Sequence, residues 1–130
     1  MENSRFQFQQ PVLKELVYRV FEEKDYDEQT NIKGRIEPSI SRLTNENSEE
    51  YARVSVCITI GEEDASTPFF IKAVEEAFFR WEKDGFTEEQ LNKLLNQNAV
   101  ALLISYVRPI ISTTTANSRY QYNLPYINLT

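Results

Sequence analysis

The sequence contains no histidine and one cysteine, Cys57, in 130 residues. Without histidine, the chain lacks the commonest general base, the Ser-His and Cys-His nucleophile pairs and the usual zinc ligand. A single cysteine can form neither an intrachain disulfide nor a CxxC metal site. The three glycines lie far apart, which excludes a glycine-rich phosphate-binding loop. We therefore expect a protein that is not an enzyme and that uses no metal and no cofactor.

Positive charge is also scarce, with 14 basic against 20 acidic residues and a net charge of −6. An acidic chain lacks the excess of cations that releases counterions from a phosphate backbone, so we expect no nucleic-acid partner. No window approaches 18 apolar residues, and the first residues are polar, so we expect no membrane insertion and a cytoplasmic location. The length fits a single domain over residues 1–130.

Alternation of apolar and polar residues predicts strands in the first half of the chain. The clearest period of two spans residues 51–60, and weaker alternation covers 6–8, 16–21 and 32–41. Pro11 has no N–H to donate and marks a bend or a sheet edge, and Pro38 weakens its strand. Polar stretches at 22–31 and 43–50 are predicted as loops.

Residues 69–81 fit two structures. Apolar residues at helical spacing form a clean stripe and favour a helix. As a strand, Ile71, Ala73, Ala77, Phe79 and Trp81 share one face, which only Glu75 interrupts, and four aromatics in thirteen residues are typical of a strand. The local pattern alone favours the helix.

A helical region is predicted from residue 87 onward. Thr87 followed by Gln90 forms a capping box, and apolar residues continue at helical spacing to Tyr106. Asn98 lies on the apolar stripe and predicts a break between two helices, while Pro109 predicts a kink or an interruption. Strands followed by helices, without strand–helix alternation, indicate an α+β fold with an antiparallel sheet.

Two further groups of side chains were candidates for function. Five pairs of adjacent acidic residues are the only acid–base candidates for an enzyme, but nothing in the sequence brings two of them into one cleft. Thirteen aromatic residues exceed what one core obviously needs: Tyr18, Phe21, Tyr26, Phe69, Phe70, Phe78, Phe79, Trp81, Phe86, Tyr106, Tyr120, Tyr122 and Tyr126. Most are interpreted as core residues, and some as the lining of an exposed apolar groove or a subunit interface.

Several segments resemble the SecB family of export chaperones. These are residues 95–108, which contain Tyr106-Val107-Arg108, the Ser/Thr-rich residues 110–115, and the stretch 124–129 with its Leu-Pro pair. Phe6-Gln7-Phe8 and residues 53–60 are similar to the opening and third strands of that family, and 69–81 to its fourth. The similarity spans most of the chain and looks closest to the short SecB-like proteins of Gram-positive bacteria.

The resemblance implies a four-stranded antiparallel sheet with C-terminal helices packed on one face, assembled as a homotetramer, a dimer of dimers. It settles residues 69–81 as a strand. It implies an ATP-independent holdase that binds unfolded or precursor polypeptides in an apolar groove and passes them to the SecA motor in protein export. The client-binding residues expected from it are Phe21, Tyr26, Tyr122, Leu124 and Tyr126, and the expected oligomer interface includes Val54, Val56 and Tyr106.

The sequence departs from the export chaperone at its end. It stops at Thr130, directly after the Leu-Pro stretch, without the terminal helix and tail that the export chaperone uses on SecA, so handover to SecA stays open. The same groove could also serve one dedicated partner, as in an antitoxin-linked or regulatory adaptor. The breadth of clients separates the two functions.

Overall fold

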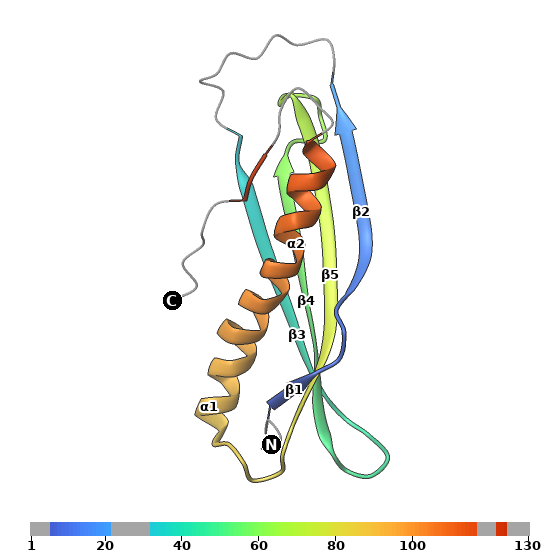
Figure 1. Ribbon diagram of the computed structural model, residues 1–130. Helices are drawn as coiled ribbons and strands as arrows, with labels where there is room; N and C mark the ends of the chain where they lie inside the picture. The colour runs from blue at the N-terminus through green and yellow to red at the C-terminus, as the bar shows by residue number, and fades with distance from the viewer. Residues whose placement is uncertain (1–5, 22–31, 117–121, 125–130) are drawn as a thin grey trace.

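The computed structural model describes residues 6–21, 32–116 and 122–124. Five strands come first: β1 Phe6–Phe8, β2 Val12–Val20, β3 Gly34–Thr44, β4 Glu50–Gly61 and β5 Phe69–Trp81. One helical run follows, made of α1 Glu88–Lys93, the π-helical turn η1 Leu94–Ala99 and α2 Val100–Thr115. The architecture is α+β, with an antiparallel sheet in the order β1/β2-β5-β4-β3 and the helix on one face (Figure 1).

The expected count of four strands was wrong by one, because the edge strand is divided. β1 and β2 both pair with β5, one after the other along its length. Pro11 lies between them, where its missing N–H and fixed φ interrupt the ladder. The sheet is therefore four strands wide but contains five strands. Pro38 is tolerated within β3 because β3 forms the opposite edge.

Residues 69–81 form the central strand β5, as the resemblance implied and against the local helical pattern. Long antiparallel ladders hold β5 on both sides, to β4 from Tyr51↔Arg80 to Gly61↔Phe70 and to β2 and β1 on the other edge. The face that Glu75 interrupts is buried from Phe69 to Phe79, Trp81 at its end is half-buried, and Glu75 itself is 3% exposed. Backbone pairing on two sides thus outweighed the helical spacing of the apolar residues.

The prediction of several C-terminal helices was also wrong, because one helical run extends from Glu88 to Thr115. The predicted capping box is present: the Thr87 hydroxyl accepts from the Gln90 N–H at 3.1 Å, and the Gln90 side chain accepts from the Thr87 N–H at 2.9 Å. Asn98 does not break the helix but lies in the wider turn η1, exposed to solvent. Pro109 lies inside α2 on an exposed side and does not interrupt it.

The core lies between the helical run and one face of the sheet, which we call the covered face. Its largest fully buried members come from β4, β5 and α2: Val54, Val56, Ile58, Ile60, Phe69, Ile71, Phe79, Leu103, Val107 and Ile111. The helix crosses the sheet diagonally, so that α1 and η1 lie toward β3 while the end of α2 lies over β5 (Figure 1). By length and composition this helix could also cross a membrane, and its buried residues pack on the sheet.

Candidate functional site

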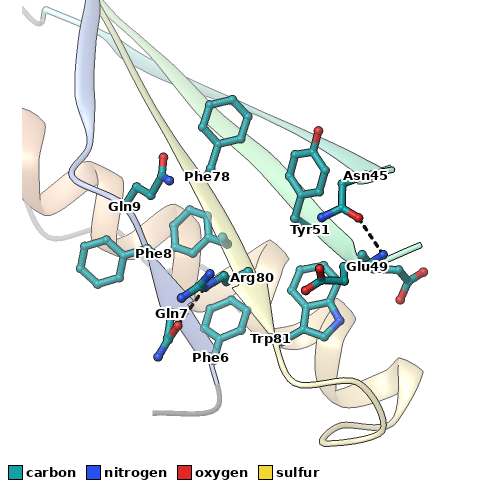
Figure 2. Close-up of a pocket in the computed structure, with 12 residues that line it drawn as sticks. Phe6, Gln7, Phe8, Gln9, Asn45, Glu49, Tyr51, Phe78, Arg80 and Trp81 are labelled. Carbon is teal, nitrogen blue, oxygen red and sulfur yellow. Dashed lines mark hydrogen bonds between the residues drawn. The ribbon is translucent and has the colours of Figure 1, made fainter. Parts of the chain in front are cut away.

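The sheet has two ends, which we call the head and the foot. The head is the end where β5 begins at Phe69, and the foot is the end where β5 finishes at Trp81 and β4 begins at Glu50. At the foot lies a hollow of about 840 Å³ (Figure 2). Its lining residues come from β1 and its following residue, the end of β5, and the β3–β4 turn with the start of β4: Phe6, Gln7, Phe8, Gln9, Asn45, Glu49, Glu50, Tyr51, Phe78, Phe79, Arg80 and Trp81. We call it the aromatic hollow.

The aromatic side chains of the hollow are held by contacts with one another. The Phe6 ring stacks on Phe79 at 5.6 Å and on Trp81 at 6.3 Å between centroids, and Phe8 lies 5.9 Å from Phe79. Tyr51 and Phe78 are 6.1 Å apart. Such pairs fix ring orientation without a fully closed core, so the hollow presents rigid apolar surface at a low cost in side-chain entropy.

Behind the hollow, Arg42 ties the start of the helix to the sheet. Its guanidinium donates to Glu88 at 2.7 Å and to Glu50 at 3.4 Å, and lies 5.6 Å from the centre of the Trp81 ring. The hydrogen bond to Glu88 raises the pKa of Arg42, and the same bond lowers the pKa of Glu88. β3, β4, β5 and α1 therefore meet at a fixed point beside the hollow.

A strip of exposed apolar side chains continues from the hollow along the edge of the sheet. Phe8, Leu13, Leu16 and Val20 are 46%, 38%, 41% and 41% exposed. Their pairing with β5 places all four on the covered face, but the diagonal helix does not reach this edge (Figure 1). The outer edge of β2 pairs with no other strand within the described residues. An unpaired edge with exposed apolar side chains is a surface on which an extended chain can lie.

The predicted client-binding residues lie elsewhere, where they can be placed. Phe21 follows β2 at the head, where its N–H donates to the Pro68 carbonyl at 2.9 Å. Tyr122 packs on Phe69 at 6.0 Å between ring centroids, its N–H donates to the Thr115 hydroxyl at 2.8 Å, and burial raises the pKa of its phenol.

Leu124 is 9% exposed and belongs to the core, and its carbonyl accepts from Arg108. Thus Phe21, Tyr122 and Leu124 gather at the head, far from the hollow. Residues 122–124 pack down as expected of the tail. Tyr26 and Tyr126, like the predicted loop 22–31, lie outside the described residues.

The residues expected at an oligomer interface have a clear place in the single chain. Val54 and Val56 have no exposed surface and pack in the core beneath the helix, so an intersubunit contact through their side chains would require the helix to leave the sheet. Tyr106 is half-buried on α2. Their role between subunits stays a prediction.

The structure also shows the surroundings of the cysteine and of the acidic residues that were considered for catalysis or metal binding. Cys57 is half-buried on β4, and burial raises the pKa of its thiol, which disfavours the reactive thiolate. No group of three or more acidic or cysteine side chains that could hold a metal ion occurs in the described part of the chain. Of the pair Glu75 and Glu76, alternation along β5 places one on each face of the sheet.

The hollow was missed at the level of the sequence because its residues come from three separate segments. One signal was available. Phe78 and Phe79 are adjacent, and a strand places neighbours on opposite faces, so one of two large rings had to leave the core. Phe79 is 1% exposed and Phe78 is 38% exposed.

Comparisons with known proteins bear on the fold. No protein-family model matches the sequence, and no curated protein is similar to it in sequence. Among solved structures, the chain is similar to the SecB-like chaperone Rv1957 of Mycobacterium tuberculosis, solved in complex with a ChAD peptide from the HigA1 antitoxin Rv1956. The TM-score is 0.63 with 15% sequence identity, over 95% of this chain and 91% of that one. The chain has a SecB-like fold.

A second solved structure has the same fold. It is a protein of unknown function from Streptococcus agalactiae, with a TM-score of 0.57, 14% identity, and coverage of 93% of this chain and 97% of that chain. At these identities the likeness concerns the fold. The resemblance to SecB read from the sequence is thereby confirmed at the level of the structure.

Proposed function

We propose that this protein is an ATP-independent, non-catalytic chaperone that binds unfolded or precursor polypeptides. One observation carries the proposal: the aromatic hollow continues at Phe8 into the exposed apolar strip of the edge strand β2. Unfolded chains share extended backbone and scattered apolar side chains, and a long apolar surface beside an unpaired strand edge can contact both. The SecB-like fold and the polypeptide bound to Rv1957 support this function.

The net charge of −6 fits the same role. A protein that exposes apolar surface needs repulsion between copies to stay in solution, and excess negative charge supplies it. We propose a soluble cytoplasmic protein that assembles as a homotetramer, a dimer of dimers. Light scattering of the purified protein tests the assembly, with a mass near four times 15.2 kDa expected.

The function is tested by suppression of aggregation of a reduced, unfolding model protein in the absence of ATP. We expect suppression at near-stoichiometric amounts. Leu16→Ser in the strip and Phe78→Ser in the hollow should each weaken it several-fold. Val12→Ser is the matched control for Leu16→Ser, because Val12 is 55% exposed on the same strand but faces the side of the sheet opposite Leu16. Equal activity of all three variants would contradict the proposed surface.

A dedicated single-partner function is the alternative, favoured by the antitoxin peptide in the Rv1957 structure. The two functions differ in breadth. A general chaperone protects several unrelated unfolding proteins, whereas a dedicated one protects none of them and binds one partner tightly. Handover to SecA in protein export stays a prediction, which direct titration of SecA with the loaded protein would test.

A further inference from the structure

The face of the sheet opposite the helix, which we call the open face, has an uneven balance of charge. Toward the middle and the head, three of its cations are paired with carboxylates. Lys72 lies 3.4 Å from Glu15, Arg19 lies 3.9 Å from Glu63, and Arg35 lies 3.0 Å from Glu62.

At the foot, Arg53 and Arg80 have no carboxylate within 4 Å in the described part of the chain. Two unneutralised arginines stand out in a protein with net charge −6.

These arginines alternate with two aromatic rings. In the β4–β5 ladder, Tyr51 lies opposite Arg80 and Arg53 lies opposite Phe78. The two rings therefore occupy one diagonal of a square, 6.1 Å apart, and the residues Arg53 and Arg80 occupy the other diagonal. Arg80 Nε donates to the Gln7 side chain at 2.9 Å, which orients the guanidinium (Figure 2). Only Nε is used in this bond, so the two terminal nitrogens remain available to form a bidentate pair.

We propose that this square, formed by Tyr51, Arg53, Phe78 and Arg80, binds an acidic and apolar segment of an extended polypeptide. A client carboxylate lies between the two arginines, and an aromatic or aliphatic client side chain packs on the two rings. The proposal rests on the proposed function and names the sequence class that this part of the site selects.

The spacing of the square fits an extended client. Side chains i and i+2 of an extended chain lie on one side, roughly 6.6 Å apart. Tyr51 and Arg53 have this same spacing on β4, as do Phe78 and Arg80 on β5. A segment with an apolar residue and an acidic residue two positions apart therefore meets a ring and a guanidinium together.

The charges around the square favour a single carboxylate over a polyanion. Glu49 and Glu50 line the same hollow, and Glu76 precedes Phe78 on the same face. A nucleic acid would bring phosphates against these carboxylates, whereas one acidic side chain reaches the arginines alone. The acidic net charge and the local preference thus point in opposite directions: cationic clients are attracted at long range, and an acidic–apolar motif is selected at the foot.

The test uses the full-length protein and two unstructured peptides that differ in one residue. One carries Phe-Ser-Asp within an apolar stretch, and the other carries Phe-Ser-Asn. Trp81, the only tryptophan, lines the hollow, so its fluorescence reports binding without a label. At low salt we expect the Asp peptide to bind about tenfold more tightly, the effect of a charge-assisted bidentate contact. Arg53→Gln and Arg80→Gln should each remove most of this preference, so that the two peptides bind with nearly equal affinity.

Arg35→Gln is the matched control, because it removes an open-face arginine that is already paired with Glu62. Equal affinity for the two peptides, or a preference that survives both foot substitutions, would overturn the proposal while leaving the proposed function intact. If neither peptide binds to the folded protein, polypeptide binding itself fails as well. A change of oligomer mass in Arg53→Gln and Arg80→Gln, with no change in peptide preference, would instead make the square a contact between copies.

Discussion

The two faces of the sheet are built on the same strands, yet they have different chemistry. On β4, Val54, Val56, Ile58 and Ile60 point to the covered face and have no exposed surface. Their neighbours Arg53, Ser55, Cys57 and Thr59 point to the open face and are exposed or half-buried. The covered face is closed by its own helix, and the open face is left to ion pairs, hydroxyls and the aromatic square at the foot.

The comparison shows which apolar side chains contribute to folding stability and which remain exposed for binding. The covered face excludes water, so its apolar area drives folding. The edge strip exposes apolar area on a part of the covered face that the helix does not reach, and the foot exposes Phe78 on the face opposite the helix. If stability and binding are separated in this way, substitutions on the two faces should differ sharply in their effect on unfolding.

The largest effect is expected from Leu103→Ala, which opens a cavity between the helix and the covered face. Leu103 has no exposed surface. Loss of a buried leucine side chain lowers the free energy of unfolding by about 2–5 kcal/mol. Urea unfolding followed by circular dichroism measures it. Ser105→Ala, exposed on the same helix, is the control, and a loss as large in the control would mean that the effect does not come from packing on the covered face.

Glu75→Met should stabilise the protein, because it removes the one carboxylate buried on the covered face of β5. Glu75 Oε1 has no hydrogen-bond partner among residues 6–21, 32–116 and 122–124, and burial raises the pKa of this carboxyl. An unpartnered buried polar group costs about 1–3 kcal/mol, and we expect a gain in this range near pH 8.

The gain should depend on pH with a definite sign. Because the folded pKa of Glu75 is raised, its protonated form is favoured by folding. The wild type is thus least penalised below the ordinary carboxyl pKa of 4.5 and loses stability as the pH rises through the raised value. Unfolding curves of wild type and Glu75→Met should converge at low pH. A gain independent of pH would mean that the pKa of Glu75 is the same in the folded and the unfolded protein. Glu76→Gln, on the open face, serves as the control.

Thr87→Ala should loosen the start of the helix that closes the covered face. It removes the side-chain acceptor of the capping box, whereas Thr87→Ser retains a hydroxyl. Loss of an N-cap costs about 0.5–2 kcal/mol. Hydrogen exchange of the Gln90 amide, which loses its acceptor, should quicken in the alanine variant and stay near wild type in the serine variant. Unchanged exchange would show that Arg42 and Glu88 hold this end without the cap.

The smallest effect is expected from Arg35→Gln on the open face. Its ion pair with Glu62 is exposed, and exposed pairs contribute about 0–1 kcal/mol. Urea unfolding at low and high salt should give nearly the same midpoint as wild type. A loss comparable with that of Leu103→Ala would erase the distinction between the two faces.

Much of the fold was predictable from local pattern. Period-two alternation located the strand that became β4, and Thr87 with Gln90 located the start of the helix. Pro11 marked the division of the edge strand. These features depend on neighbouring residues alone, either through the pleat of a strand or through the unsatisfied N–H groups of a first helical turn.

Other features needed the assembled structure. Asn98 was read as a helix break, but the π-helical turn η1 carries it to solvent and lets Leu95, Ala99 and Val100 all face the sheet. Phe69–Trp81 had a better helical stripe than strand pattern, and pairing with β4 on one side and β1 and β2 on the other decided it.

The sequence by itself determined which residues alternate, where the helix begins and that no histidine-based or glycine-loop chemistry is present. The tertiary structure alone decided which aromatics stay exposed. Phe79 and Phe78 are equivalent in composition and adjacent in the chain, but one lies under neighbouring aromatic rings on the covered face and the other on the open face. Local periodicity shows that neighbouring residues of a strand lie on opposite faces of the sheet. Whether a helix then covers that face depends on where a distant segment crosses the sheet.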